Sequence, residues 1–204
     1  GSDSVTEDLF RLMEAWAELS GRRETAAEIR LEADCGPLVL RDSLQYERRT
    51  FNGREVGCVR KDSITLYFAG GAVCDDRGRA VSEEDGALAG AGRLADIAYT
   101  LMLEGTPGCE RTENGFRYTL SLDEAGMKAV AFAIAPKAEK LETVFTSGTI
   151  GLELRDGRIA SLDFCCEGSV HVVLAEASAR IAASVDFREP SGAAFPDAAV
   201  SALA

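Results

Sequence analysis

Alternation of apolar and polar residues most constrains this chain, because it recurs along the sequence with the period of a β-strand. It is clearest at 28–35, where Ile29, Leu31 and Ala33 alternate with charged residues, and it returns over the long stretch 175–187. Strands of this kind have one apolar and one polar face. The pattern therefore predicts an antiparallel sheet that must be covered on one side.

Turn signals divide the chain into about eight such strands. Asn52-Gly53 and Asp156-Gly157 are typical of tight hairpins, and Gly70-Gly71 turns the chain after the first meander. The strands are expected at about 28–35, 38–49, 54–60, 63–69, 116–122, 150–154, 162–166 and 175–187. From Glu189 onward, the Ala/Pro-rich tail is expected to run loosely over the surface.

Three stretches have the period of amphipathic helices. The first is expected over Ser4–Leu19, the second around Leu94–Met102 before Gly105, and the third between Asp123 and Pro136. Because the sheet has a single apolar side, the helices are expected to cover that side. The predicted fold is α+β: a large, strongly curved antiparallel sheet, a half-open barrel, with an N-terminal helix and two inserted helices over the concave face.

The charge balance narrows the range of partners. The chain has 22 basic and 34 acidic residues, a formal net charge of −12 that repels phosphate backbones and anionic lipid headgroups. We therefore expect no nucleic-acid partner. No apolar run approaches the roughly 18 to 20 residues of a membrane helix. The 204 residues are expected to form a single domain, in which 1–3 are a tether or tag remnant and 189–204 a loosely packed tail.

Six cysteines are scattered along the chain without a CxxC pair. With one histidine in the sequence, they cannot form a Cys/His zinc site. An even, scattered set favours at least one disulfide, and hence export, with buried free thiols as the alternative. Cys165 and Cys166 point to opposite faces of a regular strand, which disfavours a redox-active pair.

Candidate catalytic residues are few. His171 is the one imidazole, and we interpret it as a core or rim residue, since no GxSxG motif accompanies it. Gly86, Gly90 and Gly92 lie before a predicted helix without a nucleotide-binding motif, and we expect them to form a flexible lead-in. We predict no catalytic residue, no metal site and no cofactor.

Several elements, taken in order, point to a known family. They are the N-terminal helix, the strand Glu28–Ala33, the meander ending Ser63–Gly70, the inserted helices, and the closing hairpin Ile150–Ile159. This order resembles that of the LolA/LppX-like lipoprotein carriers and related bacterial lipoproteins, over most of the chain. The resemblance implies an unclosed antiparallel barrel whose concave face, lidded by helices, holds acyl chains. The six cysteines depart from the LolA carriers themselves.

The expected function follows from the one-sided strands and from this resemblance. We expect an extracytoplasmic, non-enzymatic protein of the cell envelope, lipid-anchored or secreted, that holds a lipid or another hydrophobic molecule on the concave face. Membrane contact is expected only through an N-terminal lipid anchor that this chain does not include. The alternative is a structural or interaction lipoprotein with a filled core, whose partner is another envelope protein.

Apolar positions of four predicted strands would form the ligand-binding face. They are Ile29, Leu31, Phe116, Tyr118, Leu120, Leu162, Phe164, Ala177, Ala179 and Ile181. The alanines of the last strand leave room for a closely packed helix or for a cavity, and the sequence leaves both interpretations open.

Overall fold

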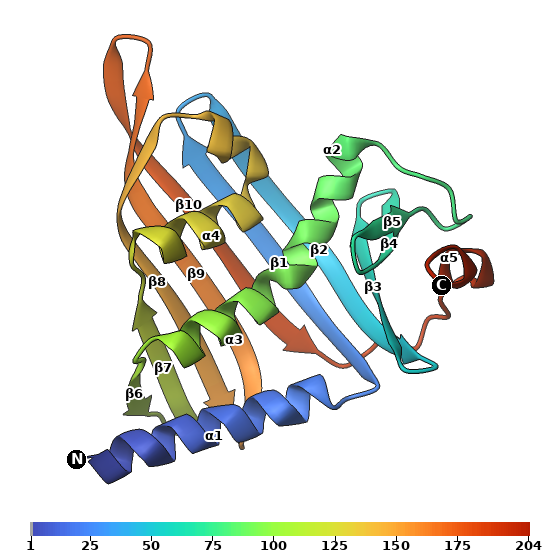
Figure 1. The fold of residues 1–204 in the computed structure, drawn as a ribbon, viewed down its shortest axis with the longest axis horizontal. Helices are drawn as coiled ribbons and strands as arrows, with labels where there is room; N and C mark the ends of the chain where they lie inside the picture. The colour runs from blue at the N-terminus through green and yellow to red at the C-terminus, as the bar shows by residue number, and fades with distance from the viewer. Residues whose placement is uncertain (1) are drawn as a thin grey trace.

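A large antiparallel sheet dominates the computed structural model, which describes residues 2–204 and side chains from residue 4 onward (Figure 1). Of the expected tag or tether at 1–3, residues 2 and 3 belong to the backbone of the first helix, and residue 1 lies outside the described residues. The strands are β1 (Glu24–Cys35), β2 (Leu38–Phe51), β3 (Arg54–Lys61), β4 (Ile64–Ala69), β5 (Ala72–Cys74), β6 (Gly108–Arg111), β7 (Gly115–Ser121), β8 (Thr143–Arg155), β9 (Arg158–Val172) and β10 (Ala175–Arg188). The predicted fold class is confirmed: the sheet is curved and open, and it does not close into a barrel.

The strand order is β5-β4-β3-β2-β1-β10-β9-β8-β7-β6. Two meanders are thus joined at the centre, where β1 and β10 pair from Ala26↔Arg188 to Cys35↔Ala179. The short edge strands β5 and β6 were not predicted, because three or four residues give too brief an alternation to detect. Since β5 and β6 lie at opposite edges, the chain between them has to cross the whole sheet.

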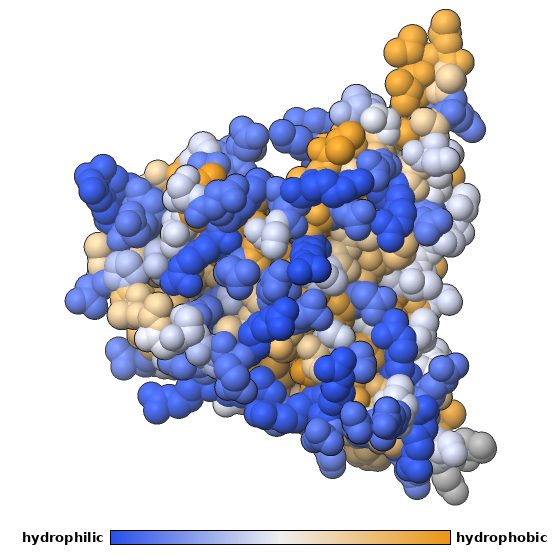
Figure 2. Space-filling model, turned by 180° about the vertical axis from the view of Figure 1, so that it is seen from behind, coloured by the Kyte–Doolittle hydropathy of each residue, from blue (hydrophilic) through white to orange (hydrophobic). Residues whose placement is uncertain are grey.

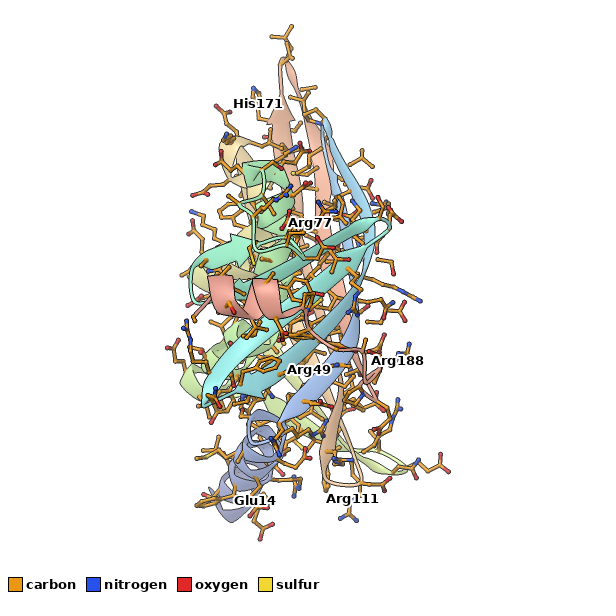
Figure 3. All side chains as sticks on the ribbon, turned by 90° about the vertical axis from the view of Figure 1, so that its right-hand side faces the viewer. Glu14, Arg49, Arg77, Arg111, His171 and Arg188 are labelled. Carbon is orange, nitrogen blue, oxygen red and sulfur yellow. The ribbon has the colours of Figure 1, made fainter. Side chains whose placement is uncertain are left out.

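All helical segments except the C-terminal one cover one face of the sheet, which we call the inner face and which carries Ile29 and Leu31 of β1 (Figures 1 and 3). The opposite, outer face carries mostly hydrophilic side chains (Figure 2). The helical segments are α1 (Ser2–Ser20), α2 (Glu83–Gly86), the 3-10 helix η1 (Ala87–Arg93), α3 (Leu94–Glu104), α4 (Glu124–Ile134), the 3-10 helix η2 (Pro136–Lys140) and α5 (Asp197–Ala202). None of them, in the part of the chain that the structure describes, is both long and apolar enough to cross a membrane.

The expected helices form, with small differences at their ends. The Asp123 carboxylate caps α4 by accepting a hydrogen bond from the backbone N–H of Gly126 at 2.8 Å. The glycine-rich stretch before α3 is not the flexible lead-in that we expected. It forms α2 and η1, because Ser82 caps α2 through the N–H of Asp85 and because alanines alternate with glycines along η1.

The first helix runs across one end of the sheet (Figure 1). Its inner side buries Leu12, Ala15 and Leu19 together with Trp16, whose ring stacks on Tyr99 of α3 at 4.5 Å between centroids. The expectation that Trp16 is a core anchor is confirmed, since the side chain is 5% exposed.

The C-terminal tail is more ordered than predicted. It crosses to the outer face of β3–β5, where α5 buries Phe195, Ala199 and Leu203 against a second apolar cluster. The expectation of a loosely packed tail is therefore wrong. The physical reason lies in strands β3 and β4, whose outer positions, such as Val56 and Tyr67, are apolar as well as their inner ones and need a cover.

All six cysteines are free, and the expected disulfide is absent from the structure. Cys165 and Cys166 face opposite sides of β9, as predicted, and Cys58 and Cys74 are separated by the intervening strand β4. Burial raises the pKa of the Cys166 thiol to about 12, so this thiol is unreactive. Export of the protein can therefore no longer be inferred from its cysteines.

The contact between η1 and the sheet depends on the ring of Phe68 on β4. This ring lies beside Gly57 of β3 on one side and Gly92 of η1 on the other. A β-carbon at position 92 would lie 2.6 Å from Phe68 Cζ and 3.1 Å from Tyr46 Cε2, both too close. At position 90 the nearest atom would be the carbonyl oxygen of Ala133 at 3.8 Å, an ordinary contact.

We therefore expect Gly92→Ala and Gly90→Ala to differ in stability, although both glycines lie on η1. The first should lower the free energy of unfolding by about 1–3 kcal/mol through overpacking against Phe68. The second should leave it unchanged or raise it by up to about 1 kcal/mol, since alanine restricts the unfolded chain. Urea denaturation measures both, and equal stabilities would contradict the contact between η1 and Phe68.

Candidate functional site

The predicted ligand face exists as a single surface, because strand pairing brings its residues into register. Leu162 pairs with Leu152, which pairs with Tyr118, so three neighbouring strands contribute to one row. In the same way, Phe164 is linked through Ile150 to Leu120. The ten predicted residues, Ile29, Leu31, Phe116, Tyr118, Leu120, Leu162, Phe164, Ala177, Ala179 and Ile181, all lie on the inner face.

Most of this surface is filled by helices. Seven of the ten belong to the main core cluster, with side chains at most 7% exposed: Ile29, Leu31, Tyr118, Leu120, Leu162, Phe164 and Ile181. The Tyr118 hydroxyl donates to the carbonyl oxygen of Asp8 in α1 at 2.6 Å, and the Arg11 guanidinium lies 3.6 Å above the ring of Phe116. Ala179 is buried beside Cys35 and Val170, whereas Ala177 is exposed. That these ten residues contact a ligand remains a prediction.

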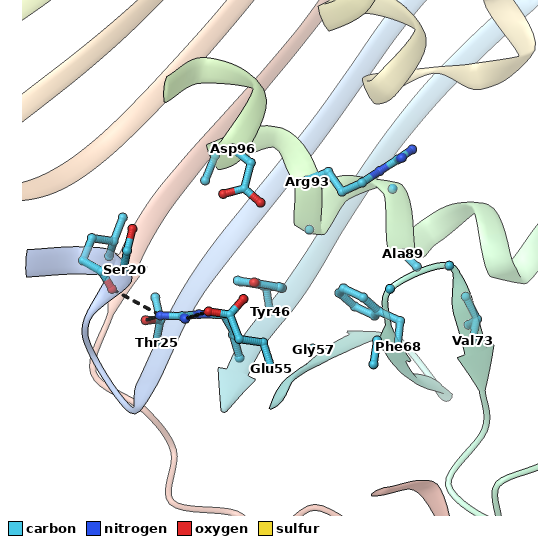
Figure 4. Close-up of a pocket in the computed structure, with 18 of the residues that line it drawn as sticks. Ser20, Thr25, Tyr46, Glu55, Gly57, Phe68, Val73, Ala89, Arg93 and Asp96 are labelled. Atoms are coloured by element: carbon cyan, nitrogen blue, oxygen red, sulfur yellow. Dashed lines mark hydrogen bonds and ion pairs between the residues drawn. The ribbon is translucent and has the colours of Figure 1, made fainter. Parts of the chain in front are cut away.

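A groove of about 500 Å³ opens elsewhere on the inner face, between η1 with the start of α3 and strands β2–β4 (Figure 4). None of the ten predicted residues lines it. Its apolar walls are the rings of Tyr46 and Phe68, stacked at 6.4 Å between centroids, together with Trp16 and Phe187. At the far end lies Gly71, whose missing side chain leaves open space.

Arg48 on β2 forms the polar wall of the groove. Its guanidinium pairs with Glu55 and donates to Thr25 Oγ1 at 2.8 Å and to the carbonyl oxygen of Leu19 at 3.2 Å. Leu19 lies in the last turn of α1, which contains no basic residue of its own. Arg48 therefore supplies the positive charge that the C-terminus of α1 needs, and this role fixes its position in the groove.

Asp96 on α3 points into the groove from the opposite side (Figure 4). Burial and the nearby Glu55 carboxylate raise the pKa of Asp96, and Arg48 opposes this shift. Burial also raises the pKa of Tyr46 to about 12. Within residues 4–204, no hydrogen bond or ion pair engages the Asp96 carboxylate. It is thus a free acceptor facing an aromatic wall.

Comparison with known proteins finds similar folds. No family model matches the sequence, and no curated protein matches it. LprF from Mycobacterium bovis is 10% identical with a TM-score of 0.47, over 95% of this chain and 97% of that chain. Lipoprotein LppX from Mycobacterium tuberculosis is 7% identical with a TM-score of 0.44, over 97% and 100%. A putative outer membrane lipoprotein-sorting protein domain from Vibrio parahaemolyticus is 9% identical with a TM-score of 0.35, over 98% and 99%.

All three TM-scores lie below 0.5, so these structures are in line with the LolA/LppX-like resemblance seen in the sequence but do not establish it. At identities this low the likeness concerns the fold alone, so no ligand or residue role is carried over to this chain.

One feature of the sequence, a group of glycines, indicates the groove. Glycines at 70, 71, 86, 90 and 92 gather around it, and their density marks a place where backbone segments approach without side chains to fill the gap. His171, the one imidazole, lies far along β9 on an exposed position opposite Glu176. His171 is therefore not a core residue, which was one of the two positions that we expected for it, because it lies close to the exposed turn at Val173 that ends β9.

Replacement of Ala179 by leucine tests whether the predicted face is a filled core. Since Ala179 is 3% exposed, we expect overpacking to lower the free energy of unfolding by about 1–3 kcal/mol. Ala177→Leu, two residues away on the same face but exposed, should change it by less than about 0.5 kcal/mol. A tolerated Ala179→Leu that displaces an apolar fluorophore would instead indicate a ligand cavity at the ten predicted residues.

Asp96→Asn tests the electrostatics of the groove. A carboxyl whose pKa is raised by folding contributes stability below its unfolded pKa, and this contribution is lost as the pH rises through the folded value. The stability of Asp96→Asn relative to wild type should therefore be constant below about pH 3.8, the ordinary value for Asp, and should increase above it. Thermal unfolding across pH measures this, and a relative stability that falls as pH rises would contradict the assignment.

Proposed function

We propose that the protein is a non-enzymatic binding protein of the cell envelope that holds a small amphipathic molecule in the groove between η1 and strands β2–β4. The observation that carries the proposal is the groove itself, whose volume of about 500 Å³ lies within the range of small-molecule sites. Helices fill the rest of the inner face, so this end of the sheet is where a ligand has room.

The chemistry of the groove defines the ligand class. The apolar part of the ligand lies against Phe68, Tyr46 and Trp16, which offer large flat surfaces. Its polar part faces Asp96, because Arg48 and Glu55 already satisfy one another. A hydrogen-bond donor attached to a short apolar body therefore fits better than a long unbranched acyl chain, which would need more of the inner face.

A purely structural or interaction role is the second candidate. The observation that favours it is the dry packing of Ile29, Leu162, Phe164 and Ile181 beneath the helices, each at most 1% exposed. Under this alternative the groove holds only water, and the partner is another protein of the envelope. The two candidates share the fold and differ in whether the groove binds an apolar molecule.

The extracytoplasmic location and the lipoprotein character rest on the resemblance of the sequence to the LolA/LppX-like proteins. The non-enzymatic role is supported by the titratable side chains of the groove. Arg48 and Glu55 pair with each other, and neither histidine nor cysteine is among the residues that line the groove. We therefore place binding, and no reaction, in this groove.

Filling the groove with a side chain tests the proposal. Gly71 is an exposed residue that lines the groove, has open space around it and has no positive φ, so leucine at this position adds bulk beside the groove without backbone strain. We expect Gly71→Leu to weaken binding of the neutral fluorophore N-phenyl-1-naphthylamine by at least about fivefold, since its ring and the leucine compete for one space. Fluorescence titration measures the dissociation constant.

Ala72→Leu serves as the matched control, because Ala72 is exposed and its partner Ala69 lies on the outer face. This variant should bind the fluorophore like the wild type, and both variants should unfold within about 0.5 kcal/mol of it. Absence of fluorophore binding by the wild-type protein would reject the binding role and favour the interaction role. Equal binding by Gly71→Leu would place the ligand elsewhere.

A further inference from the structure

The hairpin of β9 and β10 extends beyond the rest of the sheet (Figure 1, top). On one side, β1 ends at Cys35, which pairs with Ala179, so residues 175–178 of β10 have no neighbour there. On the other side, β8 begins at Thr143 opposite Val170, and the last backbone bond on that edge runs from the N–H of His171 to the carbonyl oxygen of Glu142 at 2.9 Å. The end of this hairpin is therefore a narrow, two-stranded projection.

The tip of the projection is apolar and unprotected. Val173 is 84% exposed and Leu174 is 94% exposed, more than any other large hydrophobic side chain described in the structure. Figure 2 shows them as a hydrophobic knob at the extreme end of a surface that is otherwise largely hydrophilic. Exposure of this kind opposes stability in water and calls for an apolar environment that covers it.

The backbone conformation of this turn does not favour valine at position 173. Val173 has a φ of +51°, a conformation that a β-branched residue strongly disfavours. Other tight hairpins in the described part of the chain place glycine, asparagine or aspartate at the equivalent first loop position, for example Gly36 at +59°, Asn52 at +49° and Asp62 at +52°. The β9–β10 turn alone departs from this choice. Because neither burial nor the backbone conformation favours valine here, we attribute its presence to a contact of its side chain with another surface.

The shape and charge of the tip define that contact. Two adjacent exposed side chains can insert into a fluid apolar medium, whereas a protein partner would need a pocket of complementary shape to bind them. The chain carries a net charge of −12, and Glu176 lies just behind the tip, so an anionic surface would repel it. These features together favour an uncharged or zwitterionic lipid surface over an anionic one.

We propose that the tip of the β9–β10 hairpin, Val173 and Leu174, inserts into the surface of a zwitterionic lipid bilayer. With two side chains inserted, binding is shallow and reversible. The tip shares no residue with the groove, so this proposal stands or fails independently of the proposed ligand.

Co-sedimentation with vesicles of dioleoylphosphatidylcholine tests the proposal. We expect wild-type protein to sediment with these vesicles, and less with vesicles that also contain phosphatidylglycerol. Val173→Asn should reduce the partition coefficient by at least about tenfold, because asparagine removes one of two inserted side chains. The variant remains folded, since asparagine tolerates the positive φ better than valine. Its melting temperature should equal or exceed that of wild type.

Phe10→Asn is the control, because Phe10 is 59% exposed on α1, at the other end of the molecule. This variant should bind vesicles like the wild type. In a second measurement, Leu174→Trp should shift its emission to the blue in the presence of phosphatidylcholine vesicles and should be quenched by brominated lipid. Failure of the wild type to sediment, equal binding by Val173→Asn, or binding only to phosphatidylglycerol vesicles would each overturn the proposal.

Discussion

The crossing of the inner face by a single chain segment is the constraint on which the rest of the structure depends. Because β1 pairs with β10, the two meanders end at opposite edges, and residues 75–107 must connect them across the sheet. The apolar inner face provides the path. Where this segment carries large apolar side chains, as in α3, it packs closely and forms the core. Where it is built of glycine and alanine, as in η1, a groove remains.

The groove is held in shape by contacts that belong to the fold itself. Phe68 keeps η1 at a fixed separation from β3, and Arg48 ties the groove wall to the C-terminus of α1. Because Arg48 pairs with Glu55, the Asp96 carboxylate has no hydrogen-bond donor among the described residues and remains available to a ligand. An aromatic wall opposite one carboxylate favours selective binding of a ligand over nonselective binding of apolar molecules.

The period of the strands made much of this fold predictable. Since the side-chain period of a strand is two, Ile29, Leu162 and Ala179 could be placed on one face, and strand pairing confirms that placement. The same reasoning could not tell whether the face is empty, because this depends on where η1 and α3 cross it, a matter of long-range packing. Gly86, Gly90 and Gly92 suggested flexibility from composition, whereas the need for glycine at position 92 comes from the distant Phe68. The packed tail was missed because Val56 and Tyr67 were counted only as strand residues.

The pairing of β1 with β10 also bears on how the chain reaches this structure. The edge of β1 forms early in synthesis, but the strand that covers it is the last of the sheet, about 150 residues later. Until then, both strand edges of the first meander stay open to other chains, which is a known route to aggregation. The alternating charges on the outer face of β1, which pair with Arg41, Arg180 and Arg188 in the finished sheet, oppose such association in the meantime. Folding of this protein is thus expected to be slow and cooperative, completed only when its two halves meet.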